Sequence, residues 1–382
     1  MLLSLHIYPS FLVNESRILK ETHSIAKLKL AERIVVLGFW KNNLVKEEKI
    51  EVTITFVRLN CLFSKNDNIK FLNIFSFLIF YVRCFLYAIR NKPSVIHAHS
   101  LTVLPLTVAI KIFTGCKLIY DPHELETETN ESKGLRKSIA RLIEKMLIKK
   151  ASAIITVSTS IKDWYKKTYS LKNAFVVKNI PERKWQTSTE HINLKKILDI
   201  PENEILFLYQ GMLSTSRGVE KILDCFTTIS DKQKHILFLG DGPLRSKIEN
   251  VSTQQANVHH KPAVPSYELL KYTKGADVGI HIIQNTCLNH FYCLPNKVFE
   301  YAVAGKPIII SNFPDIVTEF SEVGSAWFID PSTNDLQVTI ESITNDLLMI
   351  KSTKAEVNRN RWAWEESEEV YQEIYKSLIN EN

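Results

Sequence analysis

The sequence predicts an α/β protein of two domains, each a parallel sheet between layers of helices. Apolar, β-rich runs alternate with helical patterns along the whole chain, a pattern typical of parallel sheets covered on both faces. The 382 residues exceed the size at which one hydrophobic core usually stops growing. With 45% apolar and 23% charged residues, the composition is that of a folded globular protein and excludes a disordered chain.

The first half is expected to begin with a strand. Its start, LLSLHIY, lacks a basic leader and a small-residue cleavage site, which favours a strand over a signal peptide. Residues 71–89 are long enough to span a membrane, but Asn73 and Arg83 favour a helix that covers the sheet. Further strands are expected to begin near residues 33, 52, 94, 117 and 153, with helices from Ser16 and over 103–113 and 133–150.

The second half repeats this alternation. Its expected strands are 205–211, 235–242, 258–263, 278–283 and 307–311, with helices from Val219, Leu244 and Asn296 and over 266–274. The seam lies near Asn179–Trp185, so the predicted domains are 1–182 and 183–364, and a closing helix at about 365–382 is a candidate for packing back on the first domain. Two Rossmann-like domains that face each other are expected to bind ligands in the cleft between them.

Charge and cysteine content narrow the choice of partner and compartment. Residues 1–182 hold 28 basic against 15 acidic residues, and residues 183–382 hold 20 against 26. A basic half invites an anionic partner such as nucleic acid, a phospholipid surface or a phosphorylated acceptor, although solvated helix faces explain part of the excess. Six scattered cysteines without a CxxC pair predict reduced thiols and a cytoplasmic protein.

Two strand ends of the second half suit an anion and its attached groups. Gly211 ends one strand, and Arg217 and Gly218 then open a helix, where backbone N–H groups, the helix dipole and a forked guanidinium can hold phosphate oxygens. Gly240 and Gly242, in LGDGPL, leave room for a ribose or a base edge, although a plain strand-to-helix turn has the same letters.

The stretch LPNKVFEYAVAGKPIIIS predicts a second anion site. Asn296 is expected to cap a helix of Lys297 to Ala304, and Glu300 then lies near its positive end. The backbone N–H groups of 294–298 can face a diphosphate, while the Glu300 carboxylate, which only accepts hydrogen bonds, suits two ribose hydroxyls. Leu294, Pro295, Asn296, Lys297 and Glu300 are therefore candidate binding residues.

The sequence predicts no metal or other cofactor. There is no GxGxxG after the first strand, no P-loop and no DxD pair, so side chains and helix ends must neutralise the diphosphate. His97 and His99 lie two apart at a strand end, where a structural or sugar-edge role is favoured over metal binding. His123 follows another strand and can hydrogen-bond a sugar hydroxyl or a reacting oxygen.

The chain resembles the retaining glycosyltransferases of family 4, which have the GT-B fold. The similar stretches run in the family's order from NESRILKE (14–21) through VIHAHS, KLIYDPHELE, YQGMLSTSRGVEKIL and LGDGPL to LPNKVFEYAVAGKPIIIS (294–311). The resemblance implies that Glu300 is the second acid of the family's E-x7-E motif, and Tyr292 stands where the first acid would be. It also implies that His123 and Arg217 are catalytic, at the transferred sugar and the diphosphate.

The resemblance further implies a hexosyltransferase-type enzyme that uses a nucleoside-diphosphate sugar. Asn14, Arg17, His99 and Tyr292 are the expected contacts to the acceptor or the sugar. The basic stretch KGLRKSIARLIEKMLIKKAS from Lys133 suits attachment to the inner face of the plasma membrane and synthesis of lipid-linked surface polysaccharide such as lipopolysaccharide, with a solvated basic helix face as the alternative. A nucleotide-sugar epimerase of similar fold is the alternative hypothesis. A nucleic-acid-binding protein is a third hypothesis, but the sequence contains no recognisable nucleic-acid recognition motif.

Overall fold

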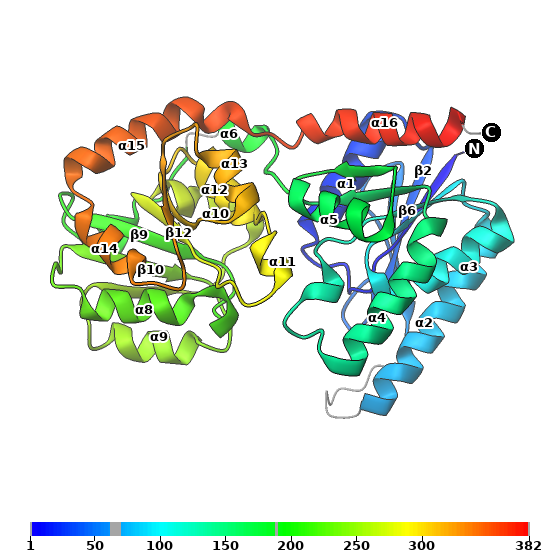
Figure 1. The fold of residues 1–382 in the computed structure, drawn as a ribbon, viewed down its shortest axis with the longest axis horizontal. Coiled ribbons are helices and arrows are strands. Elements are labelled where there is room, and N and C mark those ends of the chain that lie inside the picture. The colour runs from blue at the N-terminus through cyan, green and yellow to red at the C-terminus, as the bar shows by residue number, and fades with distance from the viewer. Residues whose placement is uncertain (1, 62–69, 188–189, 381–382) are drawn as a thin grey trace. The chain divides into compact units, whose positions relative to one another are not determined.

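The computed structural model describes residues 2–61, 70–187 and 190–380. It divides the chain into two compact units, Met1–Lys178 with Glu365–Asn382, and Asn179–Trp364. The sequence-based boundary at 182/183 therefore lies four residues too far along the chain. In each unit a sheet is flanked by helices (Figure 1).

The first unit contains an eight-stranded sheet in the order β3-β4-β2-β1-β5-β6-β7-β8. All neighbours are parallel except β3 and β4, which are antiparallel. The strands are β1 Leu3–Ile7, β2 Arg33–Trp40, β3 Glu47–Lys49, β4 Ile54–Asn60, β5 Val95–Ala98, β6 Lys117–Tyr120, β7 Ala153–Thr156 and β8 Ala174–Val176. The helices are α1 Ser16–Lys27, α2 Lys70–Asn91, α3 Leu104–Thr114, α4 Gly134–Leu147, α5 Thr159–Tyr169 and α16 Glu366–Asn380.

The second unit contains a six-stranded, fully parallel sheet in the order β11-β10-β9-β12-β13-β14. The strands are β9 Ile205–Gln210, β10 Lys234–Leu239, β11 Val258–Lys261, β12 Val278–His281, β13 Ile308–Ser311 and β14 Ala326–Ile329. The helices are α6 Lys184–Thr187, α7 Leu194–Ile197, α8 Val219–Thr228, α9 Arg245–Ser252, α10 Ser266–Lys274, α11 Leu288–Phe291, α12 Asn296–Val303, α13 Pro314–Phe320, α14 Asp335–Ser342 and α15 Asn345–Asn358.

The strands of the second sheet are apolar on both faces because helices cover both. Phe207 and Tyr209 enter one core cluster, and the alternate residues Leu206 and Leu208 enter the other. Side chains of a strand alternate between the two faces of its sheet. A near-continuous apolar run is therefore required here, and it explains why the strand segments could be located from the sequence.

The closing helix α16 is held on the first unit by polar contacts. The Lys27 ammonium lies 2.8 Å from the Glu368 carboxylate, and the Tyr375 hydroxyl lies 2.8 Å from Ser4 Oγ on β1. Residues at the two ends of the sequence thus share one folded unit (Figure 1).

The apolar segment 71–89 lies within the helix α2, which packs against α3 and β4, as expected for a helix that covers the sheet. Among the helices of the described ranges, none combines the length and hydropathy needed to cross a membrane.

Candidate active site

The predicted nucleotide-sugar residues gather at the carboxyl edge of the second sheet. Gly211 follows β9, Gly240 follows β10, and His281 ends β12. Because parallel strands point the same way, these residues share one edge of the sheet, where α/β proteins bind ligands. The loop after β9 is fixed to the loop after β10, since the Leu213 N–H donates to the Asp241 carbonyl at 3.0 Å.

Gly211 makes room for the side chain of Lys297. The backbone φ of Gly211 is +129°, and a Cβ atom there would lie 2.2 Å from Lys297 Cε. Any other residue would strain the backbone and displace the lysine. The glycine thus brings the Lys297 stem against the strand end.

Two cations at this edge have no ion-pair or hydrogen-bond partner among the described residues. Arg217 is the exposed last residue of a 3-10 turn that leads into α8, and half-buried Lys297 lies in the first turn of α12. Within the described ranges, neither side chain makes an ion pair or hydrogen bond. Burial lowers the pKa of Lys297, the Glu300 charge opposes this, and the Arg217 charge adds to it. Two neighbouring cations of this kind can attract an anion such as a diphosphate.

Glu300 is held at both carboxylate oxygens. Its Oε2 accepts from Gln210 Nε2 at 2.6 Å and its Oε1 from Asn296 Nδ2 at 2.9 Å, while Gln210 Oε1 accepts from the Thr273 hydroxyl at 2.8 Å. Each carboxylate oxygen has a further lone pair, so the oriented group can still accept from two hydroxyls.

The predicted helix cap at Asn296 was wrong. Pro295 takes the capping position, and Asn296 is already the first residue of α12. Proline fixes its own φ and needs no N–H at a helix start, so the turn is formed by the backbone. The Asn296 side chain is therefore free to orient Glu300.

The start of α9 also differs by one residue from the prediction. The helix expected from Leu244 begins at Arg245.

His281 was missed by the sequence analysis. It is 1% exposed, and neither ring nitrogen has a hydrogen-bond partner among the described residues. Burial, together with the smaller effects of the Lys297 and Arg217 charges, lowers the pKa of His281 to about 3. The sequence feature that could have identified His281 is its position as a polar residue at the end of the otherwise apolar strand VGIH.

The other predicted residues of this unit lie around the same edge. Gly218 is buried at the start of α8, and Gly242 lies in the turn before α9. Leu294 is 4% exposed and belongs to the core, so only its backbone is available to a ligand. Tyr292 is half-buried just after α11, and its contact with a sugar stays a prediction.

In the first unit, His123 follows β6 and is part of a hydrogen-bonded network. Its Nε2 lies 3.2 Å from His99 Nδ1, and its side chain is 23% exposed. Burial lowers the pKa of His123 to about 3, against an opposing effect of the Asp121 charge. The ring is therefore neutral near pH 7 and partly accessible.

Arg17 and His99 do not lie where the predicted sugar contact requires. Arg17 is 6% exposed and His99 is 2% exposed. The Arg17 guanidinium contacts Asp121 Oδ1 at 3.1 Å, Glu21 Oε1 at 2.8 Å and the Val177 carbonyl at 3.0 Å. Their burial contradicts a direct contact, because their polar atoms already face protein groups. Asn14, by contrast, is exposed just before α1, and its sugar contact stays a prediction.

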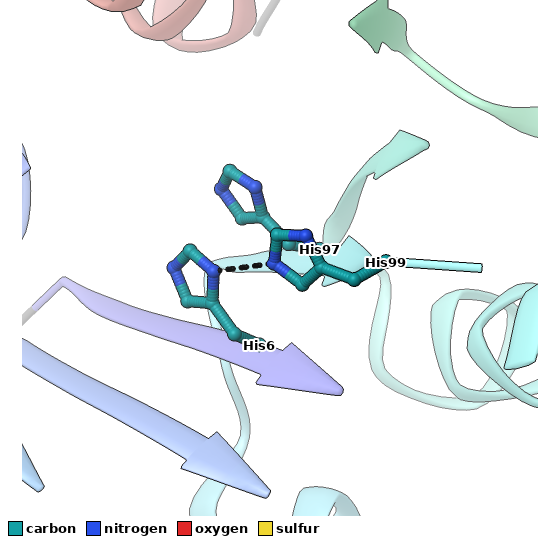
Figure 2. Close-up of side chains that lie close together, drawn as sticks. All are labelled: His6, His97 and His99. Atoms are coloured by element: carbon teal, nitrogen blue, oxygen red, sulfur yellow. Dashed lines mark hydrogen bonds between the residues drawn. The ribbon is translucent and has the colours of Figure 1, made fainter. Parts of the chain in front are cut away.

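Metal binding by the histidines is disfavoured by their orientation. The ligand atoms of His6, His97 and His99 lie within 4.8 Å of one another, and the three rings are nearly parallel, with 13° to 16° between their planes. Figure 2 shows His6 Nδ1 and His99 Nε2 facing each other, 2.9 Å apart and joined by a hydrogen bond. That bond uses the N–H of one nitrogen and the lone pair of the other, so this pair is not left for a metal ion. Glu21, His99, Asp121 and His123 also lie close together, but the Arg17 charge occupies that cluster.

Comparison with known proteins identifies the family. Residues 41–179 match the model of Glycosyltransferase Family 4, and residues 191–357 match the model of Glycosyl transferases group 1. The chain belongs to the family 4, group 1 glycosyltransferases. The protein is therefore a transferase, and this assignment is favoured over the two alternatives, a nucleotide-sugar epimerase and a nucleic-acid-binding protein.

Individual relatives are distant. The uncharacterized glycosyltransferase MJ1607 of Methanocaldococcus jannaschii is 20% identical over 314 residues, 75% of this chain and 76% of its own. A Bacillus subtilis protein named provisionally as the teichuronic acid biosynthesis glycosyltransferase TuaC is 24% identical over 238 residues, 60% of this chain and 56% of that protein. Anabaena Alr3699/HepE, solved in complex with UDP, aligns with a TM-score of 0.73 at 14% identity over 99% of this chain and all of HepE, which shows the GT-B fold.

Proposed function

We propose that this glycosyltransferase moves a sugar from a nucleoside-diphosphate sugar to a glycan or lipid-linked saccharide, with retention, in surface polysaccharide synthesis at the cytoplasmic face of the plasma membrane. The observation that carries the proposal is the pair of cations, Arg217 and Lys297, which lie near the oriented Glu300 carboxylate and have no partner among the described residues. The UDP bound by HepE and the teichuronic acid role in the name of TuaC support the same reading.

The proposed roles follow from the charge that develops in the reaction. Cleavage of the sugar–phosphate bond places negative charge on the departing diphosphate, and stabilising it is the main catalytic task. Arg217 can fork two phosphate oxygens, Lys297 supplies a point charge, and the N-termini of α8 and α12 add positive dipoles. We propose that these groups serve in place of a metal cofactor, that Glu300 accepts from the ribose hydroxyls, and that His123 contacts the transferred sugar.

A thermal-shift screen tests the donor site. The wild type is heated with UDP, GDP, ADP, CMP or dTDP without divalent metal, since a ligand at about 100 times its Kd stabilises the folded state by about 2.7 kcal/mol. One nucleotide should raise the melting temperature of the wild type and of the control Glu322→Ala, whose side chain is 76% exposed, but not of Glu300→Ala. The absence of a shift with every nucleotide would contradict the donor site.

Membrane attachment is favoured by an exposed apolar face of the first unit. Three neighbouring helices, α2, α3 and α4 (Figure 1), carry large apolar side chains that are 48% to 77% exposed. These side chains form the apolar face: Phe75, Leu78, Val82, Leu86, Ile112, Phe113, Leu135, Ile139, Leu142 and Met146. Their spacing of three or four residues along α2 and α4 forms stripes, and exposed apolar patches of this kind mark interaction sites.

The charge beside this face supports an anionic bilayer as the proposed partner. Exposed basic residues alternate with the apolar ones on α4, among them Arg136 and Lys145. An amphipathic helix of this composition lies in a membrane interface, with about 1 kcal/mol of attraction for each basic residue near anionic lipids. The acceptor of a lipid-linked pathway would be at the same surface.

Vesicle sedimentation tests this attachment. The triple variant Leu135→Ser, Ile139→Ser, Leu142→Ser should lose binding to vesicles that contain phosphatidylglycerol. The control replaces three apolar residues of the second unit that are also mostly exposed, Val338, Met349 and Val357, and should bind like the wild type. Equal binding by both variants would reject the apolar face as the membrane site.

A further inference from the structure

A chain of hydrogen bonds runs through the first unit from His97 on β5, by way of Tyr375 on α16, to His123. It begins at His97 Nε2, 2.9 Å from the Tyr375 hydroxyl, which lies 2.8 Å from Ser4 Oγ. Ser4 Oγ lies 3.1 Å from His6 Nε2, and His6 Nδ1 lies 2.9 Å from His99 Nε2 (Figure 2). His99 Nδ1 finally faces His123 Nε2 at 3.2 Å.

Asp121 fixes the direction of this chain at one end. Its buried carboxylate lies 3.5 Å from His99 Nδ1, and the Arg17 ion pair keeps it charged, as the pKa of Asp121, lowered well below its usual value, indicates. A carboxylate only accepts hydrogen bonds, so His99 Nδ1 must carry the proton. A hydrogen on His99 Nε2 as well would turn the other hydrogen bonds around and leave a buried N–H at His97 Nδ1 without an acceptor among the described residues, so His99 Nε2 is bare.

The positions of the remaining protons follow one by one from the proton on His99 Nδ1. The bare His99 Nε2 accepts from the N–H at His6 Nδ1, and the bare His6 Nε2 accepts from the Ser4 hydroxyl. Ser4 accepts from the Tyr375 hydroxyl, which accepts from the N–H at His97 Nε2. His97 Nδ1 is then bare, in agreement with its position as a buried ring nitrogen without a hydrogen-bond partner among the described residues.

The opposite direction conflicts with two observations. It would place the lone pair of His99 Nδ1 against the Asp121 carboxylate. It would also put a hydrogen on His97 Nδ1, where a buried N–H would have no acceptor among the described residues. A buried donor without an acceptor loses its hydration without compensation. The forward direction avoids the buried unpaired N–H and the 3.5 Å contact, and it leaves only the longer approach of the bare His123 Nε2 to Asp121 Oδ2, at 4.0 Å.

We propose that Asp121, acting through His99, is a positioning residue that holds His123 with its proton on Nδ1 and its bare Nε2 turned into the protein. Since Nε2 already faces the His99 donor, His123 offers a substrate only an N–H. Within the proposed function, on which this use of the ring rests, His123 therefore donates a hydrogen bond to an oxygen of the bound sugar. It does not accept the proton of the attacking hydroxyl.

Nitrogen NMR of the ligand-free protein tests the proton positions. With 15N-labelled histidine rings, a bare nitrogen and an N–H nitrogen have well separated shifts, and His123→Gln identifies the His123 signals by their absence. The wild type should show Nδ1 of His123 protonated and Nε2 bare. The reverse assignment would overturn the proposal, whatever the donor screen finds.

Asp121→Asn provides the matched variant. Arg17 only donates hydrogen bonds, so the amide oxygen of the new asparagine should pair with it. The asparagine NH2 group then faces His99 Nδ1, and every hydrogen bond of the series changes direction. The His123 proton should then move from Nδ1 to Nε2, as expected when a buried carboxylate that sets a histidine tautomer becomes an amide. The control Asp315→Asn changes a buried aspartate of the second unit, 7% exposed, and should leave His123 unchanged. An Asp121→Asn protein with the wild-type tautomer would reject the role of Asp121. Should Asp121→Asn not fold, the wild-type measurement alone decides.

Discussion

The two units hold their functional charges in opposite ways. In the first unit, Arg17 is buried and paired with Asp121 and Glu21, and the histidines are joined by hydrogen bonds. In the second unit, Arg217 and Lys297 have no ion pair or hydrogen bond with the described residues. A paired buried network orients a functional group, whereas unpaired cations at a sheet edge are left for a ligand. The difference predicts that mutations affect stability in the first unit and binding in the second.

The largest expected effect is on the stability of the first unit. Arg17→Met leaves the buried Asp121 carboxylate without its cation, which should lower the free energy of unfolding by about 3 to 5 kcal/mol. Arg361→Met is the control, because that arginine pairs with Glu322 at the surface and should cost less than about 1 kcal/mol. Urea denaturation compares the two, and similar losses would remove the contrast between the units.

The next effect is on ligand affinity in the second unit. Lys297→Met and Arg217→Met each remove one charged hydrogen-bond donor to the diphosphate, which should weaken nucleotide binding by about 1.5 to 3 kcal/mol. Stability should change by less than about 0.5 kcal/mol, because no partner is left unpaired. Calorimetric titration with the nucleotide from the screen measures the first quantity and urea denaturation the second. Loss of stability without loss of affinity would show that these cations are structural.

A smaller effect concerns pH and should be alike in both units. Burial lowers the pKa of His97 and of His281 to about 3, so between about pH 3 and 6.5 the unfolded state binds more protons than the folded state. The stability of the wild type therefore falls as the pH falls through this range. Between pH 6 and 4, the free energy of unfolding of His97→Gln and of His281→Gln should each rise relative to that of the wild type by about 1.4 kcal/mol for every unit that the pH falls. Parallel pH curves would contradict these burial effects.

The smallest effect separates a ligand-site glycine from a structural one. Gly115→Ala, at φ +74° with no atom within 4 Å of the added Cβ, should cost about 1 kcal/mol of stability through backbone strain alone. Gly211→Ala should cost a similar amount and also weaken nucleotide binding, because its Cβ displaces Lys297. Unchanged binding would mean that the lysine position does not matter to the ligand.

Local sequence determined much of the fold. Apolar runs such as ILFLYQ and VGIH located strands because strands buried on both faces need continuous apolar residues. The strands β3, β8 and β14 were not foreseen. All three lie at sheet edges and are partly exposed, where a continuous buried apolar run is not required. The helix after LPNK was located within one residue at each end, but its cap was misassigned because Pro295 competes with Asn296 for that position.

Around the site, the sequence by itself determined which residues are available and the tertiary structure decided what they do. Glu300, Arg217, Lys297 and His123 could be singled out because each follows a strand or opens a helix, and chain order fixes that. Pairing across the sheet could not be read in this way, because it joins residues far apart in the sequence, such as Arg17 with Asp121 or Ser4 with Tyr375. Burial and hydrogen bonds turned Arg17 and His99 from expected sugar contacts into supports for His123, since a buried polar group must find its partners within the fold.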